Sequence, residues 1–258
     1  MVVIAKHQAQ LEQLGLATLA RVKKFKGELV KDHRGRRDIF KIATRDSLGK
    51  PLVLFLKRNW KPYKKDGLAS LFARGKAWSQ SRREWENSLK LNGAGLRTCG
   101  LVAYGEECGL LWEKFSFLIT ESAAGETLDG FSRNCGDSKL RRTVFGALAL
   151  EIRKMHDAGL ATPDLFTRHV FVETAAGVPR VCLIDMARLD QRKKISDTMR
   201  ARDLAALNAT APLKFVPAKE RIRFLKAYAG GLDRKLVQRI ASRVKYLLKR
   251  RKFRTFAD

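Results

Sequence analysis

The sequence predicts an α+β fold of two lobes, a small β-rich lobe at residues 1–121 and a larger helical lobe at residues 122–258. Short apolar segments bounded by Gly, Pro and polar residues are typical of strands, and they are concentrated in the first half of the chain. Apolar residues at helical spacing dominate the second half. A length of 258 residues suits one large domain or two lobes that share a cleft, with enough chain to bury a core.

The chain begins with a predicted helix and a predicted β-hairpin. Residues 5–22 carry apolar side chains among polar ones at a rough helical spacing. Residues 28–42 place apolar segments on both sides of a basic turn that contains Gly35. Backbone N–H groups of such a turn, with Arg36 or Arg37, can close over phosphate groups. A solvated basic turn is the alternative, because one glycine does not make a Gly-x-Gly-x-x-Gly motif.

A strand and a helix then supply a candidate ion pair. The apolar run at residues 51–57 predicts a strand that ends on Lys57 and aims its ammonium group into the cleft. The helix that follows carries Glu84 on the same face as Ser88, four residues later, where a carboxylate can point toward the packed side. Glu86 is the competing carboxylate. A solubilising lysine and a solvated glutamate are the alternatives.

Three further strands are predicted before the boundary between the lobes. They are expected at residues 101–105, 109–112 and 115–121, and each is short and mainly apolar. Residues 122–125, Ser-Ala-Ala-Gly, are small and are typical of a loop beside Glu121. We expect a backbone hinge at this point, with an ordinary sheet edge followed by a loop as the alternative.

The second lobe holds two aspartates in an order that suits phosphoryl transfer. A predicted helix at residues 141–156 leads to Asp164, which is followed five residues later by His169 and a short apolar strand. A Gly-Val-Pro turn and a second apolar strand end on Asp185. In protein-kinase-type transfer one carboxylate orients the attacking hydroxyl, and a second at a strand end holds magnesium on the nucleotide phosphates. Two unrelated loop aspartates in a β-hairpin are the alternative.

The order of these residues resembles the lipopolysaccharide kinase (Kdo/WaaP) family. The most specific pieces are Asp-Leu-x-x-x-His from Asp164 and Ile-Asp-x-Ala-Arg around Asp185. The resemblance spans residues 25 to 230, which is nearly the whole chain. Members are bacterial enzymes with a protein-kinase-like fold that phosphorylate sugars of the lipopolysaccharide inner core.

The resemblance implies roles for the residues of the second lobe. Asp164 becomes the catalytic carboxylate, Asp185 the principal metal ligand, and His169 takes the position where typical kinases have Asn. Because Mg²⁺ prefers oxygen ligands, His169 acts either through water or by orienting the loop, and it is a metal residue of lower rank. Asp203 would brace the catalytic loop. The family usually has His two residues before the catalytic Asp, where this chain has Thr162.

The resemblance also implies a nucleotide site, with ATP and Mg²⁺ as cofactors. Lys57 and Glu84 become the ion pair that holds the α- and β-phosphates. Gly35 and Arg36 would cover the phosphates, and main-chain groups beside Glu121 would bind the adenine. These residues complete the set of cofactor-binding candidates.

The charge predicts an acidic partner. Fifty-three Lys and Arg against 26 Asp and Glu give a net charge of +27, which suits nucleic acid, an anionic membrane surface, or a phosphorylated or carboxylated substrate. Residues 234–254 place apolar residues on one side of a basic segment that holds no acid. This segment is expected either to meet anionic lipid or the lipopolysaccharide core, or to be a packed helix with a solvated basic face. The aromatic residues are not interleaved with the basic ones, so no nucleic-acid partner is expected.

Together these observations predict an ATP-dependent kinase that transfers the γ-phosphoryl group to a sugar hydroxyl of the lipopolysaccharide inner core, heptose or Kdo. Its substrate would be a lipid-linked acidic glycan. The alternatives are a catalytically degraded kinase-fold protein that only binds or scaffolds, and, less favoured, a basic nucleic-acid-binding protein. The sequence does not indicate which sugar and hydroxyl react, the oligomeric state, or a need for a protein partner.

We expect a cytoplasmic protein that is peripheral on the inner face of the cytoplasmic membrane. The N-terminal apolar run reaches Lys6 too soon for a signal peptide, and no window approaches the roughly 18 apolar residues of a spanning helix. The four cysteines form no Cys-x-x-Cys pair, which suits a reducing compartment.

Overall fold

The chain folds as two compact units. The structure, a computed structural model, describes residues 1–60, 78–109, 112–174 and 177–249. One unit holds Met1–Leu89 with Cys99–Ser122, and the other holds Lys90–Thr98 with Ala123–Asp258. Residues 90–98, expected in the first lobe, fall in the second unit because β5 (Arg97–Thr98) pairs in parallel with β11 (Arg180–Leu183). The predicted fold class, β-rich at the N-terminal end and helical at the C-terminal end, is confirmed.

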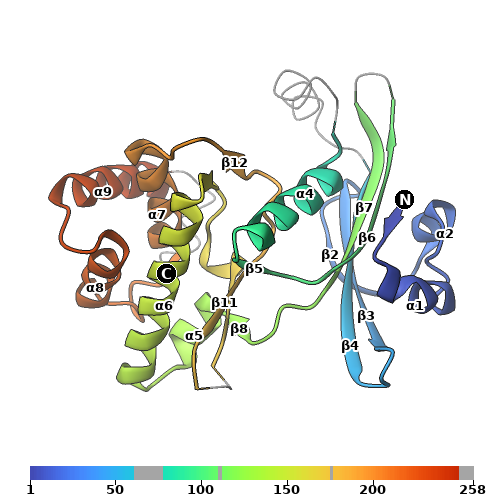
Figure 1. Ribbon diagram of the computed structural model, residues 1–258, viewed down its shortest axis with the longest axis horizontal. Coiled ribbons are helices and arrows are strands. Elements are labelled where there is room, and N and C mark those ends of the chain that lie inside the picture. The colour runs from blue at the N-terminus through green and yellow to red at the C-terminus, as the bar shows by residue number, and fades with distance from the viewer. Residues whose placement is uncertain (61–77, 110–111, 175–176, 250–258) are drawn as a thin grey trace. The chain divides into compact units, whose positions relative to one another are not determined.

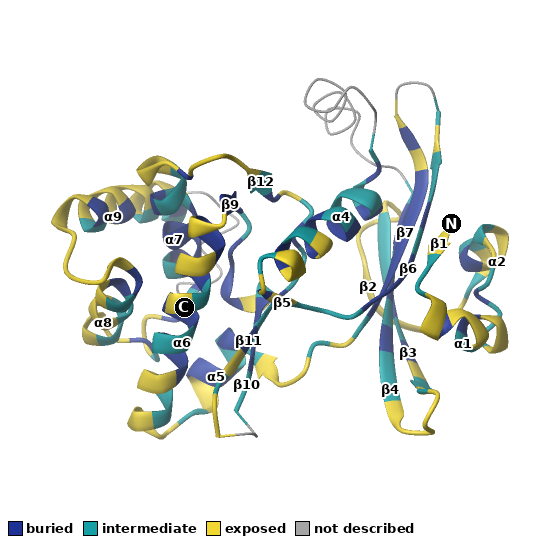
Figure 2. Cartoon of the chain, in the orientation of Figure 1, coloured by how far each residue is buried: buried dark blue, intermediate teal, exposed yellow. Residues whose placement is uncertain are grey.

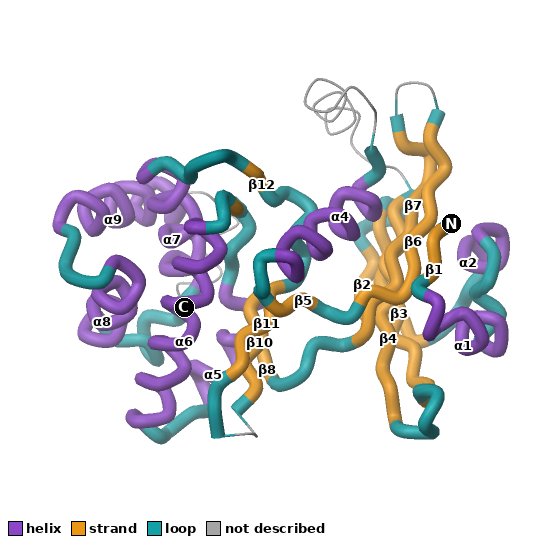
Figure 3. The backbone as a smooth tube through the Cα atoms, in the orientation of Figure 1, coloured by secondary structure: helices purple, strands orange, loops and turns teal. Residues whose placement is uncertain are grey.

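A six-stranded antiparallel sheet is the centre of the first unit, and Figure 3 shows its strands as a continuous layer. One face packs on α1 (Gln8–Gln13) and α2 (Leu19–Lys24), and the other packs on Trp85 of α4 (Gln80–Gly93). Figure 1 shows these helices on the two sides of the sheet. Side chains alternate between these two sides, as the pleat of a strand requires. In order across the sheet the strands are β1 (Val2–Val3), β6 (Leu101–Cys108), β7 (Glu113–Glu121), β4 (Pro51–Asn59), β3 (Arg37–Arg45) and β2 (Glu28–Asp32).

The structure confirms the predicted hairpin and the strand that ends near Lys57. The prediction of a single helix at residues 5–22 was wrong. A short 3-10 helix (Ala5–His7) is followed by α1 and α2, which are separated at Gly15. Gly15 has φ of +66°, which other residues adopt only at a cost, so the helix ends there. The hydroxyl of Thr18 then accepts the Arg21 N–H at 3.3 Å and starts α2.

The predicted strand at residues 109–112 is not found at its described ends, since neither Gly109 nor Trp112 lies in a strand. Strand β6 ends at Cys108 and β7 begins at Glu113, so the connection between the two strands starts at Gly109 and ends at Trp112. The N–H of Gly109 donates to the Trp112 carbonyl at 2.8 Å and closes this connection. Residues 110–111 lie outside the described residues, as does most of the basic and aromatic segment that follows β4.

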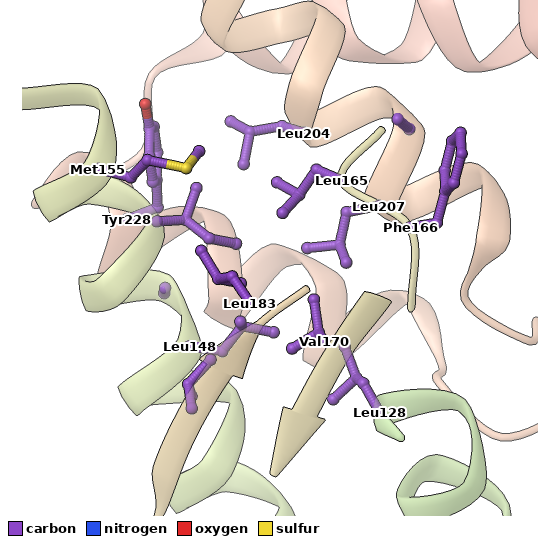
Figure 4. Close-up of a cluster of buried hydrophobic side chains, with 14 of the residues drawn as sticks. Leu128, Leu148, Met155, Leu165, Phe166, Val170, Leu183, Leu204, Leu207 and Tyr228 are labelled. Atoms are coloured by element: carbon purple, nitrogen blue, oxygen red, sulfur yellow. The ribbon is translucent and has the colours of Figure 1, made fainter. Parts of the chain in front are cut away.

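Among its described residues, the second unit combines two small sheets with five α-helices and a short 3-10 helix (Thr167–His169). One sheet has the order β5-β11-β10-β8, and the other pairs β12 with β9. Figure 4 shows how Leu148, Leu183, Leu204 and Leu207 meet in the core. The remaining strands are β8 (Glu126–Thr127), β9 (Leu160–Ala161), β10 (Val170–Glu173) and β12 (Asp190–Gln191); the helices are α5 (Leu128–Asn134), α6 (Ser138–Asp157), α7 (Asp197–Thr210), α8 (Ala218–Ala229) and α9 (Arg234–Leu248).

Helices α6 and α9 follow their apolar patterns. The helix predicted at residues 141–156 is α6, and the carboxylate of Asp137 begins it by accepting the N–H groups of Lys139 and Leu140. In α9, Leu236 and Ile240 are buried while the basic residues are exposed. Figure 2 shows buried and exposed segments alternating along this helix. Burial of such a side chain stabilises the fold by roughly 2 kcal/mol. Among the described helices, none is both long and apolar enough to cross a bilayer.

Candidate active site

The first unit contains the predicted ion pair. The Nζ atom of Lys57 lies 2.6 Å from Oε1 of Glu84, and the two side chains are only 14% and 7% exposed. Lys57 sits in β4, between β3 and β7, so its backbone is held on both sides. Glu84 projects from the second turn of α4, and Ser88 on the same face is buried with it. The geometry therefore offers a buried cation whose partner is already in place.

A buried hydrogen-bond network fixes the start of α4 to the end of β4. Asn59, two residues after Lys57, donates to Ser81 Oγ at 3.1 Å and to Ser116 Oγ at 3.2 Å. The carboxylate of Glu113 accepts the Gln80 N–H at 2.9 Å and the Ser116 hydroxyl. Burial raises the pKa of Glu113, although these two hydrogen bonds oppose the shift. Sequence reasoning missed this network; only the serines at the start of the helix are typical of a cap.

The turn at Gly35 is closed on itself. The N–H of Gly35 donates to Asp32 Oδ1 at 2.9 Å, and the N–H of Arg36 donates to the His33 carbonyl at 3.1 Å. Arg34 and Gly35 have φ of +53° and +66°, which completes a tight turn. The N–H groups predicted to cover phosphates are thus already bonded in this conformation. Phosphate binding by the Arg36 side chain stays a prediction.

The carboxylate of Glu121, the predicted hinge residue, faces the start of the chain. Its Oε1 lies 2.9 Å from Lys6 Nζ and 3.1 Å from His7 Nε2. The N–H of Glu121 donates to the Gly100 carbonyl at 2.7 Å. An adenine that used either of these groups would have to break existing bonds, so the adenine-binding role of Glu121 stays a prediction.

In the second unit Asp203 braces the Asp164 loop, as the resemblance implied. Asp203 is fully buried on α7, and its Oδ2 accepts the N–H of Thr162 at 2.6 Å. The Thr162 hydroxyl accepts the N–H of Asp164 at 3.2 Å, so this threonine also shapes the loop. Asp203 thereby holds the loop two residues before its predicted catalytic carboxylate.

A buried histidine from another part of the chain contacts the same aspartate. His156, in the last turn of α6, places Nε2 3.3 Å from Asp203 Oδ2 and Nδ1 2.7 Å from the Tyr228 hydroxyl. Burial raises the pKa of Tyr228 to about 12, so its hydroxyl stays protonated and can donate to Nδ1. Nε2–H is then free to donate to Asp203. The resemblance implied a histidine at the position of Thr162; here an imidazole from α6 reaches the bracing carboxylate.

The second unit brings Asp164, His169 and Asp185 together. Nδ1 of His169 lies 2.9 Å from the Asp164 carbonyl, and Nε2 lies 3.6 Å from Asp185 Oδ2. Burial lowers the pKa of His169 despite the opposing charge of Asp185, so the imidazole is neutral near pH 7. Nε2 also accepts a hydrogen bond from Arg168 Nε at 3.2 Å. These contacts suit the loop-orienting role of His169 better than direct coordination of a metal.

The oxygen atoms available here fit Mg²⁺. Asp185 is the carboxylate at the end of the β10–β11 hairpin, and its φ of +57° is unusual for a residue other than glycine. No group of three or more His, Cys, Asp or Glu that could hold a metal occurs among the described residues. Mg²⁺ is usually bound through one or two carboxylates, water and substrate phosphates, so Asp185 with Asp164 would be a sufficient protein contribution.

Arg188 is a residue of this site that the site prediction left out. Its Nη1 lies 3.1 Å from Oδ1 of Asp164, and its side chain is 62% exposed. The Ile-Asp-x-Ala-Arg pattern placed this arginine three residues after Asp185, and that spacing was the available indication. An exposed guanidinium beside the predicted catalytic carboxylate can also meet an incoming anion.

Comparison with known proteins agrees with this architecture. The model of the Lipopolysaccharide kinase (Kdo/WaaP) family matches residues 20–228. Lipopolysaccharide core heptose(I) kinase WaaP of Pseudomonas aeruginosa is 31% identical over 157 residues, which cover 57% of this chain and only 59% of that protein. The protein of the same name from Escherichia coli (strain K12) is 24% identical over 233 residues, 86% of this chain and 85% of that protein.

A solved structure shows the same fold. WaaP in complex with acyl carrier protein superposes with a TM-score of 0.69 at 22% identity, and the alignment covers 100% of both chains. At that identity the likeness concerns the fold alone. The family match is broader evidence, because it covers most of the chain, including β4, α4 and the Asp164–Asp185 region. The chain therefore belongs to the lipopolysaccharide kinase (Kdo/WaaP) family.

Proposed function

We propose that this protein is an ATP-dependent kinase that transfers the γ-phosphoryl group to a sugar hydroxyl of the lipopolysaccharide inner core. The observation that carries the proposal is the grouping of Asp164, His169 and Asp185, with Asp203 beneath the loop. Two relatives are named as heptose(I) kinases, so a heptose hydroxyl is the first acceptor to test, with Kdo as the second.

In the proposed reaction the acceptor oxygen attacks the γ-phosphorus, and the bond to the bridging β–γ oxygen breaks. Asp164 orients the acceptor hydroxyl and takes its proton. Lys57, held by Glu84, binds the α- and β-phosphates. Asp185 would hold Mg²⁺, which when bound neutralises charge on the phosphates. His169 keeps the carbonyl of Asp164, and with it the loop, in position.

A catalytically degraded kinase-fold scaffold is the second candidate, because the Gly35 turn is closed and Thr162 replaces the usual histidine. The buried Lys57–Glu84 pair argues against it, since a scaffold has no physical need for a buried charge pair. A magnesium-dependent rise in melting temperature with ATP supports the kinase. No shift at millimolar ATP and Mg²⁺ supports the scaffold.

Transfer of label from γ-labelled ATP to core glycolipids of defined structure tests the function directly. Acceptors that end in an unphosphorylated heptose, and matched acceptors that end in Kdo, separate the two sugars. We expect labelled heptose with wild-type protein and no label with Asp164→Asn. Absence of transfer to both acceptors, with ATP binding intact, would contradict the proposed activity.

We also propose that Arg234, Lys245 and Lys249, which are exposed basic residues of α9 and the position after it, bind the anionic inner face of the cytoplasmic membrane. Each basic residue near such a surface contributes about 1 kcal/mol. Because Leu236 and Leu247 pack into the core, deletion of α9 would damage the fold, so substitution is the better test. Arg234→Gln, Lys245→Gln and Lys249→Gln together should reduce flotation with phosphatidylglycerol vesicles. Equal flotation of wild type and variant would remove the membrane role.

An acyl carrier protein is a further candidate partner, because the solved WaaP structure contains one. Co-purification of the tagged chain with acyl carrier protein, compared with an equally basic unrelated protein, tests this proposal. Recovery no greater than with the unrelated protein would exclude a stable complex.

A further inference from the structure

A basic groove lies between α7 and α9 of the second unit, apart from Asp164 and Asp185. Its volume is about 850 Å³, which is within the range of roughly 300–1,000 Å³ of small-molecule sites. Four cationic side chains line it: Arg202 from α7, and Lys235, Arg239 and Arg243 from α9. No acidic residue belongs to the described lining. The groove is therefore electrostatically suited to a ligand with several negative charges.

The packing of α9 fixes these cations in place. Lys235, Arg239 and Arg243 are four residues apart, so they form one row along the helix. Leu236 and Ile240, each next to a member of this row, are buried in the core and prevent the helix from turning on its axis. Nη1 of Arg239 also lies 3.4 Å from the Thr198 hydroxyl across the groove. The row is thus a preformed feature of the fold.

Arg202 connects the groove to the Asp164 loop. Its Nε donates to Asp203 Oδ1 at 2.7 Å, and its Nη1 donates to Asp190 Oδ2 at 2.9 Å. Its Nη2 is buried and has no hydrogen-bond partner among the described residues. Because Asp203 also holds the N–H of Thr162, one side of the groove shares a support with the loop of the predicted catalytic carboxylate.

The neutral residues of the groove suit a carbohydrate. Thr198, Gln238 and Ser242 add hydroxyl and amide groups that can bond to sugar hydroxyls. Tyr246 is 48% exposed, and the guanidinium of Arg243 lies 4.7 Å from its ring centre. A tyrosine ring offers an apolar face to the C–H face of a sugar, and its hydroxyl offers a polar edge. Cations, neutral polar groups and an aromatic ring together match an acidic oligosaccharide.

We propose that the α7–α9 groove binds the phosphate- and carboxylate-bearing sugars of the acceptor glycan. That this glycan is the lipopolysaccharide core rests on the proposed function. Binding of an acidic oligosaccharide by the groove is argued from its lining residues and does not depend on that function. A recess with neutral hydrogen-bonding groups fits separate sugar units better than a flat bilayer surface. Binding of a lipid headgroup in the groove is the alternative that the test below distinguishes.

The test uses two triple variants that each remove three positive charges. The groove variant is Lys235→Gln, Arg239→Gln and Arg243→Gln. The matched control is Lys139→Gln, Lys219→Gln and Lys226→Gln, whose side chains are exposed and lie outside the groove lining. The probe is deacylated core oligosaccharide that retains its phosphates and carboxylates. Its Kd is measured by equilibrium dialysis without ATP, so the result does not depend on catalysis.

We expect the Kd of the groove variant to rise about tenfold or more, since three screened charged contacts are lost. The control should change by less than about twofold. Equal Kd values for wild type and groove variant would overturn the proposal, and so would an equal loss in both triples, which indicates unspecific attraction. Loss of binding to phosphatidylglycerol vesicles alone would overturn it in favour of lipid.

A replacement variant and the comparison of binding with phosphate transfer distinguish the remaining outcomes. If the groove triple melts early, Arg239→Gln alone replaces it, because this exposed residue can change without exposing the core. If wild-type protein binds the oligosaccharide through the groove but transfers no phosphate, the proposed kinase function fails and the groove proposal stands. If phosphate is transferred and groove substitutions leave both the Kd and the KM for oligosaccharide unchanged, the groove proposal fails alone.

Discussion

The two predicted parts of the active site are built in different ways. Lys57 and Glu84 project from a strand and a helix, and their side chains are 14% and 7% exposed. Asp164 and Asp185 lie outside helices and strands, and their side chains are 16% and 27% exposed. Removing one partner of the Lys57–Glu84 pair leaves a buried charge unpaired, whereas the ion-pair partner of Asp164 is the exposed Arg188, which water can solvate. Damage to the first part should thus cost both stability and activity, and damage to the second should cost activity.

The largest effect is expected for Asp164→Asn. The amide cannot take the acceptor proton, so we expect kcat to fall by roughly a thousandfold, within the range of general acid–base catalysis. The KM for ATP and the melting temperature should stay close to wild type, because the loop is held by its backbone. Asp129→Asn, at a partly exposed position in the same unit, is the control. A wild-type rate for Asp164→Asn would show that the role was assigned to the wrong residue.

The second largest effect is expected at the Lys57–Glu84 pair, where the contributions to stability and to activity can be measured separately. Glu84→Ala leaves the Lys57 ammonium buried without its partner, and we expect the free energy of unfolding to fall by about 3 kcal/mol. Lys57→Met combined with Glu84→Leu should recover much of that loss while activity stays absent. Urea unfolding and turnover are measured on the same samples. The control is Glu86→Gln on the same helix, and an equal loss of stability there would contradict the special role of Glu84.

A smaller effect is expected at the brace beneath the Asp164 loop. Tyr228→Phe removes the hydroxyl that bonds to His156, so a buried nitrogen loses its partner and unfolding becomes easier by roughly 1–2 kcal/mol. Tyr246→Phe, at an exposed tyrosine, should stay within about 0.5 kcal/mol of wild type. Thermal melts compare the two. If both variants have the same melting temperature, the Tyr228–His156 hydrogen bond does not stabilise the fold.

The smallest effect concerns the pH dependence of the first unit. Burial raises the pKa of Glu113, and nearby Glu106 acts in the same direction while Arg83 opposes it. A carboxyl group whose pKa is higher in the folded state binds protons more readily there, so its contribution to stability is full at low pH. That contribution is lost as the pH rises through the folded-state pKa.

The stability of wild type relative to Glu113→Gln should therefore decrease between acidic and neutral pH. Urea unfolding of both proteins across this range measures the difference. Glu107→Gln, at a more exposed carboxylate of the same sheet, provides the reference. A difference that grows in the opposite direction would show that hydrogen bonds outweigh burial at Glu113.

The parts of the fold that the sequence predicted are those with strong local patterns. The apolar run before Lys57 and the helical face of Glu84 were readable, because strand and helix periodicities act over a few residues. The hairpin between Asp164 and Asp185 was readable for the same reason. Gly15 and Thr18 were also interpretable as the end of one helix and the start of another, yet the broad apolar spacing of residues 5–22 concealed them.

The remaining features depend on contacts between distant segments. Asn59, Ser81 and Ser116 come from three elements, and no local pattern indicates that they meet. The closed turn at Gly35 is an intermediate case, since an aspartate three residues earlier is typical of a turn that caps its own N–H groups. The Lys6–Glu121 contact joins residues 115 positions apart, which a single sequence does not reveal.

The positive φ of Asp185 favours glycine at this position, whereas the proposed metal-binding role requires a carboxylate. A side chain at φ of +57° costs roughly 1 kcal/mol, a penalty that glycine escapes. Selection for heat resistance alone would thus favour glycine at position 185, and selection for turnover would keep the carboxylate. A library at position 185 should be enriched in glycine when it is selected for survival of heating, and in aspartate when it is selected for phosphate transfer. Laboratory evolution of a more thermostable active enzyme would therefore have to change other positions.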